Sequence, residues 1–524
     1  VYSDNSTPNV TNSYDRRGRL ITTKEAGVTN TMSYNDAGLL TSETFGTVTV
    51  SNIYDSLLRR ITNGIVNSGG TWLTVVTNNY DAASRLSVVS DRTNSATYFY
   101  LATNPLVSQI TFAQSGTERM ITRKAYDGLN RLTSISHSNS PLGLFDAYRY
   151  AYNTANQRTA VTNAENSWWH YGYDALGQVT AGKKYWSDST LVAGQQFEYT
   201  YDDIGNRKTA ASGGDQWGAN LRYENYTANN LNQYTARTVP GAIDVLGAAN
   251  SNATVTVNLL ATTRKGEYFR AEVPVTNSVL PAYAGLTNVG VLANGANPDI
   301  VTTNLGFALV PKASETFSYD LDGNLLTDSL WTNAWSAENR LIAVGSASGV
   351  TTNAWMRETW SYRSDGRWSE RVVSAWNGTS YVPQFTNRFV WDRRVLLAIL
   401  DTANAVTMSF MRGLDLSGSR QGAGGNGGAL AITIATNGTH FYAYDGNANI
   451  TGLTSASDGS RSAVYEFDPF ARPLRASGVV ALANPLRFST QFTDDMTGDL
   501  VYLLRPNRPA LGRWPSRDPI EERG

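Results

Sequence analysis

Residues of the types that most often carry catalysis or metal binding are sparse in this chain. The sequence of 524 residues has three histidines, His137, His170 and His440, and no cysteine. The histidines lie far apart and do not show the spacing of metal ligands. Neither a Gly-x-Ser-x-Gly elbow nor a Walker loop is present. The sequence therefore predicts no metal site and no cofactor, and it does not favour a Ser-His-Asp triad.

Two segments match the letters of a known site without its structural context. Residues 422–427 read GAGGNG, but a dinucleotide-binding turn needs a strand before it and a helix after it. Residues 429–434 have the pattern of a strand, so we interpret the match as accidental. Residues 320–323 read DLDG like the start of a calcium loop, but Trp331 stands where an EF-hand requires glutamate. Neither segment predicts ligand binding.

A turn that begins with tyrosine and aspartate recurs along most of the chain and indicates the architecture. Clear copies begin at Tyr14, Tyr34, Tyr126, Tyr173 and Tyr201, weaker ones at Tyr54, Tyr80, Tyr152 and Tyr226, and the pattern returns at Tyr319, Tyr362, Tyr444 and Phe467. A repeat of about 20 to 50 residues is typical of solenoids and arrays. Alternating aromatic residues, as in 148–152, precede the turn and fit a half-buried strand. Each unit therefore predicts a hairpin, and stacked hairpins share an apolar face that one hairpin cannot bury alone.

The residues of this turn have a structural explanation. Asp suits the first corner because its carboxylate accepts a backbone N–H, and Gly suits the last because it tolerates positive φ. We therefore expect the tyrosines and aspartates of the repeat to pack and to cap turns rather than to catalyse a reaction.

Composition favours a folded all-β chain without a strongly charged partner. Hydrophobic residues make up 41% of the sequence and charged residues 17%, which is too apolar for disorder. Abundant Tyr, Thr, Val and Asn favour strands and turns over helices. The net charge of −1 gives no global field that would recruit nucleic acid or an anionic membrane. No apolar run approaches the length of about 18 residues that a spanning helix needs, so we expect neither a nucleic-acid partner nor a membrane span.

The periodicity divides the chain into four segments. A first repeat block covers residues 1–237, and the repeats resume in residues 314–413. Between them, residues 238–313 contain short strand-like runs separated by Gly, Pro and Asn, which predicts an inserted small β-sandwich. Such an insert would brace the scaffold or bind sugar. Residues 414–524 form the C-terminal section, and the first residue is Val1 rather than Met, so we expect a fragment of a longer product.

Tryptophans are concentrated in the second repeat block. They are Trp331, Trp335, Trp355, Trp360, Trp368, Trp376 and Trp391. Such a set fills a core or lines a glycan groove, and the strand alternation favours the core.

These residues resemble a known family. The Tyr-Asp units resemble the YD repeats of RHS proteins, a group that also includes bacterial toxin-complex shells and the animal teneurins. The C-terminal section resembles the RHS-associated core domain in residues 444–450 (YDGNANI), 465–474 (YEFDPFARPL), 486–498 (LRFSTQFTDDMTG) and 512–520 (GRWPSRDPI). The resemblance implies a long β-sheet that spirals into a hollow shell around a variable C-terminal effector, with the core closing one end.

The resemblance also implies candidate residues for self-cleavage, an aspartyl-type reaction that uses two acids and an arginine. The first acid corresponds to Asp518 and the arginine to Arg505. The family's Arg-Tyr-Tyr-Asp-Pro stretch reads RPNRP at residues 505–509, so both tyrosines and the aspartate are lost. The second acid would lie downstream of Gly524. We therefore do not expect this fragment to cleave itself, and we interpret Asp518 as a turn cap or strand-end group.

The expected protein is an all-β, spiralling, shell-like sheet of stacked hairpins with an inserted small β-sandwich. Its expected function is that of a non-catalytic scaffold that encloses or presents its own C-terminal effector, as part of a secreted or cell-surface protein. The alternative is a cell-surface adhesion or carbohydrate-binding array with a glycan or protein receptor. A third hypothesis, an autoprotease, requires an acid beyond this chain.

Overall fold

The computed structural model describes residues 9–25, 27–139 and 143–518, and these are built almost wholly from antiparallel strands. Among the described residues, the only helical elements are two single turns of 3-10 helix, η1 (Thr352–Ala354) and η2 (Phe488–Thr490). The predicted all-β fold is therefore confirmed. Within the same ranges, no helix has the length and apolar character needed to cross a membrane.

The first sheet is a meander in which each strand pairs with the next one along the chain. Its last pairing joins β20 to β28, so the segment between these two strands is an insertion at one point of the sheet. The strands are β1 (Val10–Tyr14), β2 (Leu20–Glu25), β3 (Val28–Tyr34), β4 (Leu40–Phe45), β5 (Val48–Tyr54), β6 (Arg60–Asn67), β7 (Trp72–Tyr80), β8 (Leu86–Ser90), β9 (Asn94–Tyr100), β10 (Val107–Gln114), β11 (Thr117–Tyr126), β12 (Leu132–Asn139), β13 (Gly143–Tyr152), β14 (Arg158–Asn163), β15 (Trp168–Tyr173), β16 (Val179–Tyr185), β17 (Leu191–Tyr201), β18 (Arg207–Gly213), β19 (Leu221–Ala228), β20 (Tyr234–Thr238) and β28 (Ser314–Thr316).

A β-bulge accompanies the tyrosine of many of these hairpins. Tyr54 pairs with Arg60 and Tyr80 pairs with Leu86, and in both hairpins the register shifts directly before the tyrosine. A bulge bends its strand and increases the local right-handed twist. Because it recurs at the same place in successive hairpins, the sheet curls instead of staying flat.

The repeated side chains clamp each turn to the next hairpin. Asp81 accepts hydrogen bonds from the backbone N–H groups of Ala83 and Arg85, at 3.0 and 2.8 Å. The Arg85 side chain donates to the other oxygen of Asp81 and lies 4.3 Å above the ring of Tyr100. The Tyr100 hydroxyl then donates to the carbonyl of Leu86, at 2.5 Å. Cation–π contact and hydrogen bonds thus link consecutive units, as expected for residues that pack and cap.

The second sheet continues the same pattern and is also a meander. Its strands are β29 (Ser318–Tyr319), β30 (Leu325–Thr327), β31 (Trp331–Trp335), β32 (Leu341–Ser346), β33 (Met356–Tyr362), β34 (Trp368–Trp376), β35 (Tyr381–Asp392), β36 (Val395–Leu400), β37 (Val406–Arg412), β38 (Ala429–Ile434), β39 (Gly438–Tyr444), β40 (Ile450–Ser455), β41 (Arg461–Phe467) and β42 (Pro473–Ser477).

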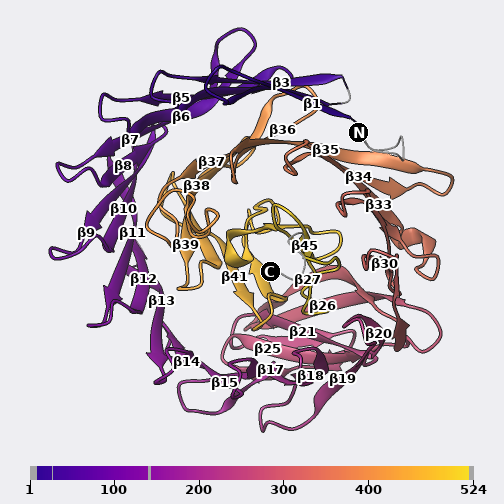
Figure 1. Cartoon of the computed structure of the whole chain (residues 1–524). Coiled ribbons are helices and arrows are strands. Elements are labelled where there is room, and N and C mark those ends of the chain that lie inside the picture. The colour runs from indigo at the N-terminus through magenta and orange to yellow at the C-terminus, as the bar shows by residue number, and fades with distance from the viewer. Residues whose placement is uncertain (1–8, 26, 140–142, 519–524) are drawn as a thin grey trace.

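The two sheets form a spiral in which the later strands pass inside the earlier ones (Figure 1). Strands β30 to β34 complete the ring, and strands β35 to β41 lie against the concave face of the first sheet. The ring of Phe112 in β10 packs on Phe441 in β39, with 5.2 Å between centroids. Arg60 in β6 forms an ion pair with Asp392 in β35, at 2.5 Å. The chain's own strands therefore occupy much of the space inside the ring.

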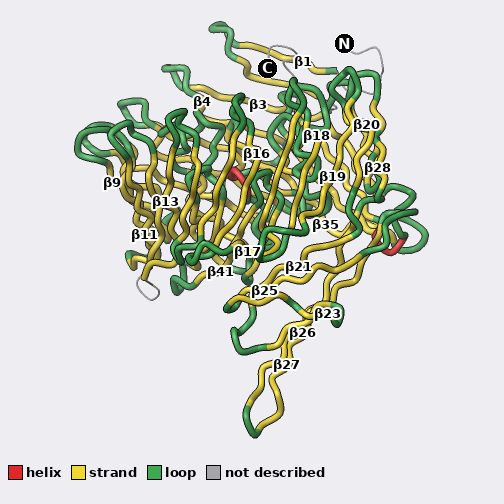
Figure 2. Tube along the Cα trace, turned by 90° about the horizontal axis from the view of Figure 1, so that it is seen from below, coloured by secondary structure: helices red, strands yellow, loops and turns green. Residues whose placement is uncertain are grey.

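The segment between β20 and β28 forms two small sheets that pack on each other, as the predicted β-sandwich insert requires. Their shared core is Val255, Val257, Phe269, Ala271 and Val273. Figure 2 shows the insert projecting from one end of the spiral. The strands are β21 (Ala242–Ala248), β24 (Thr263–Lys265) and β25 (Tyr268–Pro274) in one sheet, and β22 (Thr254–Val257), β23 (Leu260–Ala261), β26 (Ala282–Asn294) and β27 (Asn297–Val310) in the other.

The C-terminal section ends in a three-stranded sheet at the centre of the spiral (Figure 1). It consists of β43 (Phe492–Thr493), β44 (Leu500–Val501) and β45 (Pro506–Asn507). Phe492 packs edge-on against Trp368 and Phe389 of the surrounding sheet, with ring centroids 5.2 and 5.6 Å apart. The C-terminal section is therefore part of the same core as the repeats.

Candidate functional site: the cavity at the centre of the spiral

A cavity of about 810 Å³ lies between the C-terminal section and the walls of the spiral. Residues of β3 and β4 form one side, residues of β34 and β36 another, and the loops around β43 to β45 form the floor. Both residues predicted from the family resemblance, Arg505 and Asp518, line this cavity.

Arg505 and Asp518 are in direct contact although thirteen residues separate them. The guanidinium donates to the Asp518 carboxylate at 2.5 Å, and the two side chains are 17% and 33% exposed. Arg505 also lies 4.3 Å above the ring of Trp514. The geometry thus brings the two predicted residues together, and their role in catalysis stays a prediction.

The other carboxylates that line this cavity are also bound to arginines. Glu43 forms ion pairs with Arg363 and Arg367, and Asp365 pairs with Arg367 at 2.5 Å. Burial opposes ionisation of Asp365, but the hydrogen bond and charge of Arg367 outweigh it and lower the pKa of this carboxyl. An aspartyl-type dyad needs two carboxyl groups that share one proton. Here Glu43 and Asp365 share Arg367, and Asp518 pairs with Arg505, so each of these carboxylates has an arginine partner. The second acid expected from the family resemblance falls outside the described residues.

A buried pair of carboxylates that the sequence did not single out lies next to the same section. Arg371 in β34 donates to Glu358 in β33 at 2.8 Å and also binds Asp494, which follows β43. Burial first, and then the negative charge of Asp494, raise the pKa of Glu358 to about 8. Asp494 additionally accepts a hydrogen bond from the Thr497 hydroxyl. This group joins the C-terminal section to the wall of the spiral, and no repeat motif marks Glu358 or Arg371 in the sequence.

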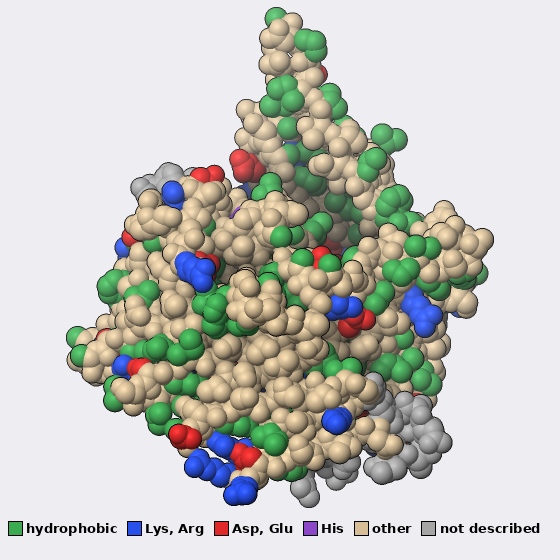
Figure 3. All heavy atoms as spheres, turned by 90° about the horizontal axis from the view of Figure 1, so that it is seen from above, with side chains coloured by type: hydrophobic (Ala, Val, Ile, Leu, Met, Phe, Trp, Pro, Cys, Tyr) green, Lys and Arg blue, Asp and Glu red, His purple; other side chains and the backbone are tan. Residues whose placement is uncertain are grey.

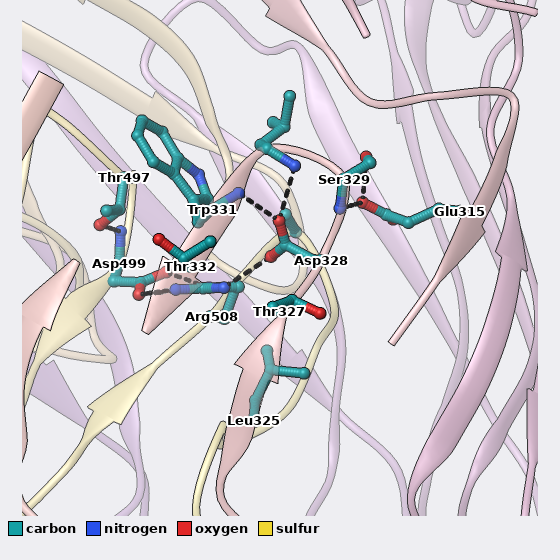
Figure 4. A network of polar contacts seen from close by, with 12 residues as sticks. Glu315, Leu325, Thr327, Asp328, Ser329, Trp331, Thr332, Thr497, Asp499 and Arg508 are labelled. Atoms are coloured by element: carbon teal, nitrogen blue, oxygen red, sulfur yellow. Dashed lines mark hydrogen bonds and ion pairs between the residues drawn. The ribbon is translucent and has the colours of Figure 1, made fainter. Parts of the chain in front are cut away.

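A second buried network anchors the section at Arg508 (Figure 4). Arg508 pairs with Asp328 at 2.7 Å and with Asp499 at 2.9 Å, and its side chain is 4% exposed. Burial raises the pKa of Asp499 although Arg508 opposes this shift. Asp328 also caps its own turn, because its carboxylate accepts hydrogen bonds from the backbone N–H groups of Leu330 and Trp331. Arg508 therefore serves as a structural cation.

The glycine-rich segment at 422–427 folds around a carboxylate. Asp415 accepts hydrogen bonds from the backbone N–H groups of Ala423 and Gly425, at 2.7 and 3.1 Å. A phosphate would need such N–H groups to be free. The segment leads into strand β38 (Ala429–Ile434), so the predicted strand is confirmed, and a helix does not follow the segment as a dinucleotide-binding turn requires.

Two of the three histidines, and four of the tryptophans noted in the sequence, are buried. His137 is fully buried, its Nδ1 lies 2.9 Å from the Thr122 hydroxyl, and its Nε2 lies 3.1 Å from the backbone nitrogen of Tyr444. His440 contacts the Ser462 hydroxyl at 2.8 Å. In the described part of the chain, no group of three or more His, Cys, Asp or Glu side chains could hold a metal ion. Four of the seven tryptophans are at most 5% exposed: Trp331, Trp360, Trp368 and Trp391.

No family model matches the sequence. Over 242 residues it is 24% identical to a protein named tRNA3(Ser)-specific nuclease WapA from Bacillus spizizenii. Over 243 residues it is 25% identical to the tRNA nuclease WapA of Bacillus subtilis. Each match covers 45% of this chain and 9% of the relative, so the chain is similar to a small part of much longer proteins.

Two solved structures align with nearly the whole chain. One is the crystal structure of TcdB2-TccC3, with a TM-score of 0.42, 14% identity, and 98% of this chain and 27% of that chain covered. The other is the Photorhabdus luminescens Tc holotoxin pore, with a TM-score of 0.41, 15% identity, and 98% of this chain and 26% of that chain covered.

Proposed function

We propose that this chain is the β-scaffold of an RHS-type, toxin-related protein, and that it carries and presents a variable C-terminal effector. The observation that carries the proposal is the position of the C-terminal section. Residues that lead to the end of the described chain lie inside the spiral and are fixed to its walls by Arg371 and Arg508. The similarity to proteins named as nucleases supports an effector beyond the scaffold, and the similarity to a holotoxin pore supports the toxin context.

The cavity volumes favour presentation of an effector over its enclosure between these turns. Two cavities between the overlapping turns measure about 810 and 670 Å³, and a third of about 510 Å³ lies between the second sheet and the C-terminal section. A domain of 100 residues has a radius of gyration of about 13 Å and a volume on the order of 10,000 Å³. Each cavity therefore holds a short peptide and not a folded domain. In this proposal the effector lies outside the two described turns.

The scaffold itself is non-catalytic in this proposal. Arg505 holds Asp518 as an ion pair, and Glu43 and Asp365 are likewise bound to arginines. Self-cleavage would need a further acid downstream of Gly524 that displaces one of these pairings. A repeat scaffold of this kind, delivering an effector, belongs in a secreted or cell-surface protein.

The proposal is tested with the full natural product, including any sequence that follows Gly524. The segment beyond the scaffold, expressed alone in bacteria, should arrest growth, whereas residues 1–524 alone should not. If both parts are inert and residues 1–524 bind immobilised glycans, the adhesion alternative replaces the effector scaffold.

The intact mass of the same product separates a passive scaffold from a self-processing one. A single uncut chain from both the native protein and the Asp518→Ala variant is the expected result. Two fragments from the native protein and one from the variant would overturn the non-catalytic role while retaining the toxin context.

A further inference from the structure

The insert ends in a long hairpin that stands away from the rest of the molecule. Strands β26 and β27 pair from Ala282 opposite Val310 to Asn294 opposite Asn297. Figures 2 and 3 show this hairpin projecting from one face of the spiral. Strand β22 covers part of the outer edge of β26. Within the described residues, β27 pairs with β26 alone, so the other edge of β27 is open.

The open strand carries large apolar side chains that face solvent. Val301, Leu305 and Phe307 are 59%, 77% and 65% exposed, and Ile300 is 53% exposed. Val301, Leu305 and Phe307 lie on one face of the strand because alternate residues point the same way. Asp299 is the one charged residue between positions 282 and 310.

This edge lacks the features that keep natural sheet edges apart. Edge strands are usually blunted by lysines, prolines, bulges or covering loops, and an exposed, flat, apolar edge is a template for strand pairing. In β27 the sole such feature is Pro298, which lies at the tip. Main-chain pairing along such an edge supplies affinity, and side-chain fit supplies specificity.

We infer that β27 pairs with β27 of a second copy of this chain, so that the two hairpins form one continuous sheet. A symmetric antiparallel pairing centred on Thr303 places Val301 of one copy opposite Leu305 of the other. The two Asp299 side chains are then separated by eight residues, about 27 Å along the strand, and do not repel each other. Because both sides of an isologous contact use the same surface, an uncharged apolar edge is complementary to itself.

The apolar part of this contact is modest. The exposed parts of Ile300, Val301, Leu305 and Phe307 on two copies come to at most about 1,000 Å², and edge-to-edge pairing covers the flanks of these side chains rather than the faces of the sheet. Main-chain hydrogen bonds between the two edges add to this apolar contact. The inference rests on the hairpin alone and does not depend on the proposed function.

Sedimentation velocity of the full 524-residue chain tests the oligomeric state over a range of concentrations. The native chain of 57.1 kDa should reach the mass of a dimer. Leu305→Lys should raise the dissociation constant at least tenfold, because it places a charge on the paired edge. Val382→Lys is the matched control, since Val382 is an exposed apolar strand residue of β35 at 40% exposure.

Cross-linking tests the pairing register, because the native chain contains no cysteine. Thr303→Cys should form an inter-chain disulfide on mild oxidation, since residues at the centre of a symmetric pairing have Cα atoms about 4.5 to 5.5 Å apart. Thr287→Cys, on the neighbouring strand β26, should not. A native chain that stays at 57.1 kDa at every concentration would overturn the inference. So would binding of a monomer to phosphatidylcholine vesicles that Leu305→Lys abolishes.

Discussion

At the scale of the residue, one turn motif occurs in both exposed and buried surroundings. Asp468 is the aspartate of one such turn. Its carboxylate accepts hydrogen bonds from the backbone N–H groups of Phe470 and Arg472, and the Arg472 side chain donates to its other oxygen at 2.8 Å. Asp81 makes the same three kinds of contact on the outside of the ring. The Asp468 side chain is only 1% exposed, so its hydrogen bonds and ion pair form out of contact with water.

Removing the buried member of this pair should be far more costly than removing the exposed one. Asp468→Ala leaves the backbone N–H groups of Phe470 and Arg472 without their buried acceptor, and an unsatisfied buried donor costs about 1 to 3 kcal/mol. The Arg472 side chain is 34% exposed and keeps Glu224 at 4.0 Å, so its charge adds little to the loss. We expect Asp81→Ala to lower stability much less, because water replaces the lost contacts. Urea denaturation followed by tryptophan fluorescence measures both, and equal losses would contradict the importance of burial.

Glu358 should make stability depend on pH in a defined window. Its pKa is about 8 in the folded protein against an ordinary value of 4.5, so the folded state holds the proton more tightly. This contribution is complete below pH 4.5 and is lost as the pH rises through about 8, with a slope of about 1.4 kcal/mol per pH unit. Burial lowers the pKa of His137 from 6.5 to about 4, so measurement above pH 6.5 excludes its titration.

Calorimetry of Glu358→Gln between pH 6.5 and 9 isolates this effect. The native melting temperature should fall between pH 6.5 and about 8 and level off above it, and the variant should show a flatter profile because glutamine does not titrate. Glu370→Gln is the control, since Glu370 lies in the adjacent strand with a side chain 34% exposed. A native profile as flat as that of Glu358→Gln would contradict the prediction.

At the scale of the element, the overlap of the two turns requires close approach between strands. Gly182 in β16 faces Pro469 in the turn after β41, and a Cβ atom at this glycine would lie 2.5 Å from the proline ring. The same region has an ion pair between Lys184 and Glu466 at 2.5 Å. The inner strands therefore rest directly on the outer sheet at this point.

Gly182→Ala should force these two layers apart. Overpacking at buried contacts typically costs about 1 to 3 kcal/mol. Gly290→Ala in β26 is the matched control, because no atom lies within 4 Å of a Cβ placed there. Hydrogen exchange should increase in β41 and β42 for Gly182→Ala alone, whereas unchanged exchange would mean that the layers adjust without loss.

At the scale of the whole molecule, the C-terminal section holds the spiral together from inside. It contacts β33 and β34 through Arg371 and the β30–β31 turn through Arg508. Its apolar residues belong to the same core as Trp360 and Trp368 of the surrounding sheet. The section is therefore expected to unfold together with the repeats around it.

Arg508→Met should release this section from the wall. It leaves Asp328 and Asp499 buried without a cation, a loss of about 3 to 5 kcal/mol. Limited proteolysis should then cleave between residues 494 and 518 first. Arg475→Met, at an exposed position of β42, should leave the digestion pattern unchanged. Equal resistance of the native chain and Arg508→Met would show that the apolar core suffices.

Much of the architecture is predictable from the sequence because it depends on local chemistry. The turn from Asp81 to Arg85 forms from side chains within five residues, and it repeats wherever those residues repeat. The contact between Arg505 and Asp518 was predictable only through the family resemblance, since nothing local relates the two residues. Glu358 and Arg371 carry no motif, so their pairing with Asp494 had no signal in the sequence.

The sequence by itself determined the hairpin unit and the all-β class, because spacing, turn residues and strand alternation act over a few residues. The tertiary structure alone decided how tightly the spiral closes. That closure depends on contacts such as Arg60 with Asp392 and Phe112 with Phe441, which join residues more than 300 positions apart. It also decided that cavities of about 810 and 670 Å³ lie between the overlapping strands. Small bends at each bulge add up over many strands, and the sum appears only when the whole sheet is assembled.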